Sequence, residues 1–134
     1  MSEVAGRLSI EAAARSLQRV HGGPGILMGG VPGVAPARVM VLGGGVVGYH
    51  AARMATGLGA LVVILDRSLP GLRQLDVMFQ GRLTTAFATR HEIEQQAALA
   101  DAIIGAVLVP GARAPKLITR AMLPAIKPGA VLVD

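Results

Sequence analysis

The sequence predicts an α/β fold in which five parallel strands form a doubly wound sheet. From Arg38 onward, short aliphatic runs alternate with segments whose apolar residues recur at helical spacing. The runs consist almost entirely of Val, Leu, Ile, Ala and Met, which is typical of strands covered on both faces. Aromatic residues are nearly absent, with one Tyr and two Phe in 134 residues, so aliphatic side chains must build the core. Right-handed helical crossovers should then place the strands in the order 3-2-1-4-5.

A long helix is expected at the start of the chain, from Ser2 to about Val20. Ala, Leu and Ile recur there at helical spacing, and Gly22-Gly23-Pro24 follows as a stop signal. The connector that follows, up to residue 37, is rich in glycine and proline and predicts a loop with room for one short strand at 26–28.

The remaining elements follow from the alternation of apolar runs with turn residues. Strands are expected where β-branched and aliphatic residues cluster, and helices where the apolar residues lie three or four positions apart. The segment after the fourth strand is punctuated by Pro110, Gly111 and Pro115, and Pro128-Gly129 precedes the last strand. The predicted strands are 38–42, 61–65, 82–86, 102–108 and 130–133, and the predicted helices are 45–57, 69–78, 90–99 and 117–123.

The first strand runs directly into Gly43-Gly44-Gly45-Val46-Val47-Gly48, a GxGxxG pattern that opens a helix. A helix N-terminus offers unpaired N–H groups and a positive dipole to an anion, so this context predicts a turn that binds the pyrophosphate of a dinucleotide. Gly43 is expected to permit the tight turn, Gly45 the close approach of the phosphates, and Gly48 the close packing of helix on strand.

Asp66 ends the second strand, eighteen residues after Gly48. A carboxylate at this place can accept both hydroxyl protons of an adenosine ribose and repels a 2′-phosphate, which favours NAD over NADP. The alternative is that Asp66 caps the next helix. Arg67 beside it could flank the adenine, accommodate a 2′-phosphate or be simply solvated.

Composition excludes several other classes of function. The net charge is +5, yet the 13 basic residues are scattered singly, which argues against a nucleic-acid partner. The absence of cysteine excludes a disulfide framework and a thiolate metal site, and three widely separated histidines predict no metal. Every apolar run is too short to span a bilayer, and no basic leader precedes an apolar core, so we expect a cytoplasmic protein that does not enter the membrane.

Several further motifs resemble alanine dehydrogenase. More broadly, the chain is similar to the NAD-binding domain that this family shares with the alpha subunit of proton-translocating nicotinamide nucleotide transhydrogenase. The similarity covers essentially the whole chain. Its motifs are Met1-Ser2-Glu3-Val4-Ala5-Gly6-Arg7, Gly29-Gly30-Val31-Pro32-Gly33-Val34, the glycine turn, Gly105-Ala106-Val107-Leu108-Val109-Pro110-Gly111, Ala114-Pro115-Lys116-Leu117 and Lys127-Pro128-Gly129-Ala130.

The resemblance implies a Rossmann-like NAD-binding domain at 38–134, one unit short of the usual six strands at its C-terminal end, preceded by a helix and connector at 1–37. It also implies further cofactor contacts. Ser2 would approach the pyrophosphate from the first helix, and Val46 and Val47 would supply backbone amides. Val107 and Leu108 would line the nicotinamide end.

The resemblance further implies an activity and partners. The family interconverts L-alanine and pyruvate plus ammonia with NAD, usually as a homohexamer, and takes its substrate-binding and catalytic residues from a separate domain. We therefore expect no catalytic residue in this chain and no activity from it alone. The expected partners are NAD, a substrate domain and further copies of the chain. The alternatives are a non-catalytic module that binds NAD, another adenine nucleotide or a partner subunit, and a transhydrogenase-like NAD domain.

Three positions depart from the pattern of the family. The resemblance implies a basic residue at 71, a serine at 88 and an asparagine at 50, and this chain has Gly71, Ala88 and His50. Each change is expected to weaken cofactor binding by about 0.5–1.5 kcal/mol, the net value of one hydrogen bond.

Overall fold

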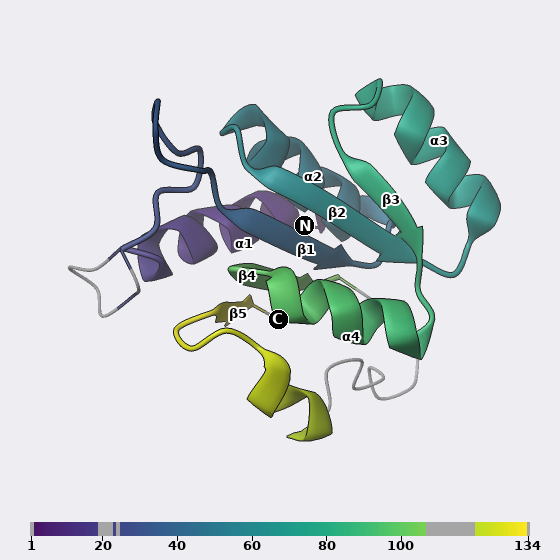
Figure 1. Cartoon of the computed structure of the whole chain (residues 1–134). Coiled ribbons are helices and arrows are strands. Elements are labelled where there is room, and N and C mark those ends of the chain that lie inside the picture. Colours follow the sequence, from purple (N-terminus) through teal and green to yellow (C-terminus); the bar gives the residue numbers. More distant parts are fainter. Residues whose placement is uncertain (1, 19–22, 24, 107–119, 134) are drawn as a thin grey trace.

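The computed structural model describes residues 2–18, 23, 25–106 and 120–133 of the chain. Within these residues a single five-stranded sheet runs through the molecule (Figure 1). All neighbouring strands are parallel and lie in the order β3-β2-β1-β4-β5, which confirms the predicted fold class and strand order. The elements in chain order are α1 (Ser2–Ser16), β1 (Arg38–Leu42), α2 (Val46–Gly57), β2 (Leu61–Asp66), α3 (Leu69–Phe79), β3 (Thr84–Phe87), α4 (Arg90–Leu99), β4 (Ala102–Gly105), the 3-10 helix η2 (Arg120–Ala125) and β5 (Val131–Val133).

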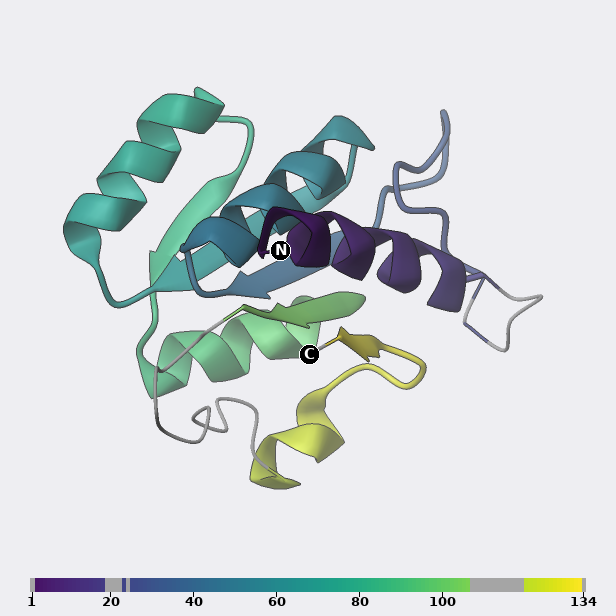
Figure 2. The same cartoon turned by 180° about the vertical axis from the view of Figure 1, so that it is seen from behind.

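Helices cover both faces of the sheet, as Figures 1 and 2 show from opposite sides. Successive residues of a strand point to opposite faces, so β1 supplies both layers of the core. Val39 and Val41 pack with α1, α2 and α3, whereas Met40 and Leu42 pack with α4 and η2. This double coverage explains why the strands read as unbroken aliphatic runs rather than as alternating polar and apolar residues.

The N-terminal helix α1 belongs to the core. Ile10, Ala13 and Leu17 are fully buried in the same cluster as β1 and α2. Gly6 permits the close crossing of α1 over α2, since a Cβ there would lie 2.5 Å from the carbonyl oxygen of Val47. The division of the chain between residues 37 and 38 stays a prediction.

The predicted end of the first helix is wrong by four residues, because α1 ends at Ser16 and not near Val20. The carbonyl oxygen of Leu17 accepts hydrogen bonds from the N–H groups of Gly25 and Ile26, at 2.9 and 3.0 Å. The chain therefore folds back on the helix end. The connector contains no strand at 26–28; among its described residues, Val31 and Val34 form an isolated bridge.

The third strand also starts later than predicted, at Thr84 rather than residue 82. Gln80 and Gly81 have positive φ angles of 51° and 77°, and the N–H of Arg82 donates to the carbonyl of Phe79 at 3.0 Å. The two positive φ angles and this hydrogen bond keep the chain out of the strand conformation as far as Leu83. The predicted strand at 102–108 is too long, because β4 ends at Gly105 and Ala106 lies outside it, while 107 and 108 lie outside the described residues. The predicted helix at 117–123 overlaps η2. Among the described helices, none is long and apolar enough to cross a membrane.

Candidate functional site

In the glycine turn between β1 and α2, the backbone leaves no place for a side chain at Gly43 or Gly48. Gly43 has a φ of 104°, a conformation that glycine adopts without strain, and its N–H donates to the carbonyl of Leu65 at 2.8 Å. A Cβ at Gly48 would collide with the carbonyl oxygen of Gly43 and lie 3.4 Å from Cγ1 of Val41. The first turn of α2 therefore rests directly on the backbone that leaves β1.

The amino end of α2 differs from those of α3 and α4. Ser68 caps α3 and Thr89 caps α4, each by accepting a backbone hydrogen bond at 3.1 Å. The N-cap of α2 is Gly45, which has no side chain to do so, and the first turn of α2 carries no acidic residue. A Cβ at Gly45 would have no atom within 4 Å. The unpaired N–H groups and the positive end of this helix are therefore open to an anion such as pyrophosphate.

Asp66, at the end of β2, faces this turn. Its Oδ2 accepts a hydrogen bond from the N–H of Gly44 at 2.6 Å, and its Oδ1 accepts one from the N–H of Ser68 at 2.9 Å. A carboxylate has about four lone-pair sites, so two remain for ribose hydroxyls. The alternative role as helix cap is taken by Ser68, whose hydroxyl accepts from the N–H of Gly71.

The sequence alone did not reveal the part played by Gly44 and Ser68. Their N–H groups fix both oxygens of Asp66 and so orient the carboxylate toward the glycine turn. Gly44 occupies a variable position of the GxGxxG pattern, which carried no signal of this contact. Ser68, two residues after the carboxylate, is the residue type that could have suggested a local turn.

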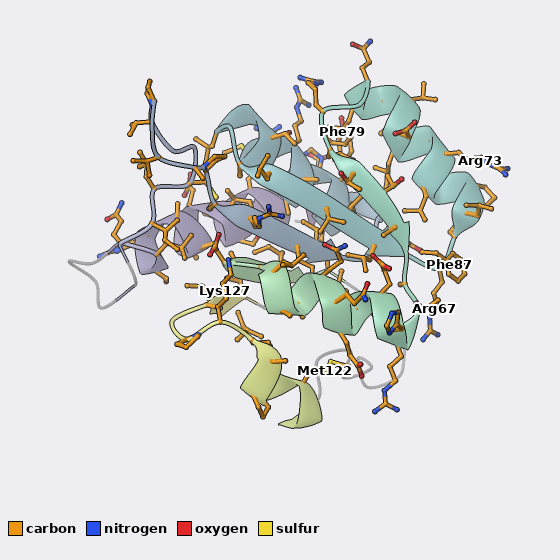
Figure 3. All side chains as sticks on the ribbon, viewed as in Figure 1. Arg67, Arg73, Phe79, Phe87, Met122 and Lys127 are labelled. Carbon is orange, nitrogen blue, oxygen red and sulfur yellow. The ribbon has the colours of Figure 1, made fainter. Side chains whose placement is uncertain are left out.

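Arg67 and Phe87 lie at the same end of the sheet, where β2 and β3 finish (Figure 3). Phe87 is directly opposite Asp66 in the β2–β3 register and is half-exposed. Arg67 is exposed and Ala88 is buried. Phe87 thus comes from β3 to the same edge of the sheet as Asp66, a neighbour that spacing in the sequence did not indicate.

His50 lies between α1 and α2. Its Nδ1 is 3.5 Å from Nε of Arg7, and its Nε2 is 4.0 Å from a carboxylate oxygen of Glu3. The side chain is mostly buried, and its ring meets Tyr49 edge-on at a centroid distance of 5.1 Å. At this position His50 therefore helps to join the two helices.

The other predicted site residues are placed only in part. Ser2 begins α1, whose first turns cross the first turn of α2, and its side chain lies outside the description. Val107 and Leu108 lie outside the described residues, so their predicted contact with the nicotinamide stays a prediction. Within the described part of the chain, no group of three or more His, Cys, Asp or Glu side chains is arranged to hold a metal.

A family model described as the alanine dehydrogenase/PNT C-terminal domain matches residues 9–134. The chain belongs to this family. The resemblance drawn from the sequence motifs is thereby confirmed, and it extends over both helical layers and the whole sheet.

Individual members of the family agree closely with the chain. It is similar to the alanine dehydrogenase of Halomonas elongata, with 62% identity over all 134 residues. A solved structure of an L-alanine dehydrogenase is 50% identical over the full chain with a TM-score of 0.97. The transhydrogenase of Sinorhizobium meliloti is 29% identical over 99% of the chain, with a TM-score of 0.79. The chain spans 36% to 38% of the length of these three relatives.

Proposed function

We propose that this chain is the NAD-binding domain of an L-alanine dehydrogenase. The observation that carries the proposal is the uncapped amino end of α2 facing Asp66 across the Gly43–Gly48 turn. The similarity to alanine dehydrogenases of nearly three times its length supports the proposal that the chain is one domain of such an enzyme. NAD supplies hydride-transfer chemistry when bound; the protein positions it.

The residues of the turn divide the work of holding the dinucleotide. The N–H groups of Val46, Val47 and Gly48 would bind the pyrophosphate, because the first N–H groups of a helix have no partner within it. Asp66 would accept the hydroxyl protons of the adenosine ribose and disfavour a 2′-phosphate. Arg67 would lie along the adenosine side, together with Ala88 and Gly71.

Oxidative deamination of L-alanine to pyruvate and ammonia would then need substrate-binding and catalytic groups from a substrate domain. We propose that the chain alone does not reduce NAD with L-alanine. An absorbance assay for NADH checks this directly, and measurable turnover by the purified chain would contradict it.

Calorimetric titration with NAD, NADP and ADP tests the binding proposal. We expect binding of NAD and ADP and weaker binding of NADP. No heat with any of the three nucleotides would exclude a nucleotide site, and tighter binding of NADP than of NAD would exclude the role given to Asp66.

Two variants connect the binding to named atoms. Gly45→Ala adds a methyl group where the phosphates would approach, so the affinity for NAD should fall roughly tenfold or more, equivalent to about 1.4 kcal/mol. Gly57→Ala, at the other end of the same helix, is the matched control, since its Cβ also meets no atom within 4 Å.

Asp66→Asn keeps one acceptor oxygen but loses the charge, and it should raise the affinity for NADP relative to NAD. An unchanged ratio would contradict the ribose role.

A second candidate function is a transhydrogenase-like NAD domain, which the likeness to the Sinorhizobium meliloti transhydrogenase favours. Both candidates share the nucleotide site, and they differ in the partner domain. Mixing this chain with the substrate domain of an alanine dehydrogenase would separate the two candidates, because recovery of L-alanine oxidation supports only the first.

We further propose that the protein acts in the cytoplasm as a homo-oligomer. Cell fractionation tests the location, and light scattering tests the oligomeric state.

A further inference from the structure

One aromatic residue of the chain is exposed at the edge of the sheet that carries the glycine turn. Tyr49 and Phe79 lie close together, at a centroid distance of 5.6 Å, and Phe79 is buried in the core. Phe87, the last residue of β3, is 49% exposed and belongs to neither cluster of core residues. Single exposed apolar residues are common on protein surfaces, so the surroundings of Phe87 must decide whether it has a function.

The side chain of Phe87 lies on the same face of the sheet as the carboxylate of Asp66. In the parallel register these two residues are direct partners. Ala86 and Leu65 pack in the core layer of α4, so the residue after each of them points to the opposite face. Neighbouring strands are about 4.8 Å apart, so the ring and the carboxylate are next to each other at the end of the sheet.

The backbone holds Phe87 in place at this edge, which Figure 3 shows with Phe87 and Arg67 labelled. The N–H of Ala88 donates to the carbonyl of Asp66 at 3.0 Å, and the N–H of Thr89 donates to the carbonyl of Phe87 at 2.8 Å. Thr89 in turn caps α4. A phenyl side chain has only two rotatable bonds, so a flat ligand that covers the ring would immobilise little.

The order of the strands indicates the direction in which the base of a bound dinucleotide extends. Under the proposed function, the pyrophosphate lies at the amino end of α2, which follows β1, and the ribose hydroxyls lie on Asp66, which ends β2. A nucleotide ribose carries its phosphate and its base at opposite ends of the ring. The base therefore extends from Asp66 away from β1, and the next strand in that direction is β3, which ends at Phe87.

We propose that Phe87 holds the adenine of the dinucleotide by stacking, with its ring against the face of the base. Stacking on an aromatic side chain needs no hydrogen-bonding group, because every base has a π-face. The next residue, Ala88, is buried and has no polar side-chain group, so it offers the base no side-chain hydrogen bond. The inference rests on the proposed nucleotide site and adds to it the residue that holds the base.

An introduced tryptophan gives a direct signal of stacking, because the chain has none. In Phe87→Trp a larger ring replaces the phenyl ring. We expect ADP and NAD to quench the fluorescence of the introduced tryptophan, after correction for absorption by the nucleotide, and to bind at least as tightly as to the wild type. Leu99→Trp is the matched control. Leu99 is 47% exposed at the opposite edge, beside the first residues of the strands, and a tryptophan there should keep its fluorescence.

Affinities separate a stack from a purely structural role. Phe87→Ala removes an exposed ring, so circular dichroism should show an unchanged fold, while calorimetry should show the affinities for ADP and NAD fall roughly tenfold, equivalent to about 1.4 kcal/mol. Phe87→Tyr keeps the ring and should keep the affinity. Phe87→Leu keeps an apolar side chain without a π-face and should give an intermediate value. Inorganic pyrophosphate has no base, so it should bind the wild type and Phe87→Ala equally, as measured by displacement of ADP.

The possible failures differ from one another. No binding of ADP or NAD by the wild-type chain would refute the nucleotide site and the inference with it. Wild-type binding that is unchanged in Phe87→Ala would keep the site and refute the stack. Equal losses of affinity in Phe87→Ala and Phe87→Tyr, or an unquenched Phe87→Trp that still binds ADP, would also refute the stack, because the ring itself would then make no contact with the base.

Discussion

Replacing Gly48 by alanine should destabilise this domain, whereas the same change at Gly57 should not. Both glycines lie in α2, so part of the gain in helix propensity, which reaches about 1 kcal/mol in a helix interior, is available to both. At Gly48 the new methyl would collide with the carbonyl oxygen of Gly43 and lie 2.9 Å from its carbonyl carbon. These are backbone atoms at a turn with a φ of 104°, so they cannot move aside as a flexible side chain would.

The net loss follows from these opposing terms. Forcing a methylene-sized group into packed structure costs about 1–3 kcal/mol, and the propensity gain offsets part of it. We expect Gly48→Ala to lower the free energy of unfolding by about 1–2 kcal/mol and the melting temperature by roughly 5 °C. Gly57→Ala meets no atom within 4 Å and should raise stability by a few tenths of a kcal/mol to about 1 kcal/mol.

Urea denaturation followed by circular dichroism measures both variants against the wild type, with equal slopes as the condition for comparing midpoints. NAD titration then shows whether the displaced turn still binds pyrophosphate; the affinity should fall in Gly48→Ala only. Equal midpoints for the two variants would refute the reasoning, because the collision would then be relieved without cost.

Two further predictions concern polar groups that hold the elements in place. Asp101 is nearly buried and accepts hydrogen bonds from the N–H of Arg38 at 2.8 Å and from Nζ of Lys127 at 3.2 Å. Asp101→Ala should lower the free energy of unfolding by about 1 kcal/mol because it leaves the part-buried N–H of Arg38 without its acceptor, and Asp101→Asn should cost less because it keeps an acceptor; equal losses in urea titration would contradict this. Ser68→Ala and Thr89→Ala remove side-chain caps and should each cost about 1 kcal/mol, measured as a lower melting temperature. No change in either variant would mean that water replaces the cap.

The sheet could be predicted from the sequence because each strand is defined by its own residues. Aliphatic runs such as 38–42 and 61–65 are covered on both faces, so hydrophobicity alone marks them. The predicted end of α1 and the predicted start of β3 were wrong because backbone hydrogen bonds and turn conformations outside these elements decide where they end or begin. The carbonyl of Leu17 is taken by Gly25 and Ile26, and the turn at Gln80 and Gly81 delays β3. No local pattern reports such bonds.

In the candidate site too, features of one short segment could be predicted from the sequence, and contacts between distant segments could not. The steric roles of Gly43 and Gly48 are properties of one short segment, so the glycine spacing was sufficient to indicate them. The contact between Gly44 and Asp66 joins residues 22 positions apart, and Phe87 reaches the same edge from β3. Those neighbours became visible only once the strand order and register were known.

The structure also gives the departure at Gly71 a consequence that can be measured. Its N–H bonds to the cap Ser68, and a Cβ there would lie 3.1 Å from Oγ of that serine, a tight but adjustable contact. Gly71→Arg should therefore fold, and it would return the basic side chain that the family resemblance implies beside the adenosine. One added hydrogen bond is worth about 0.5–1.5 kcal/mol, so the affinity for NAD should rise about two- to tenfold. Because NAD and ADP share the adenosine half, calorimetry should show the same factor for both. A gain for NAD without a gain for ADP would place residue 71 away from the adenosine.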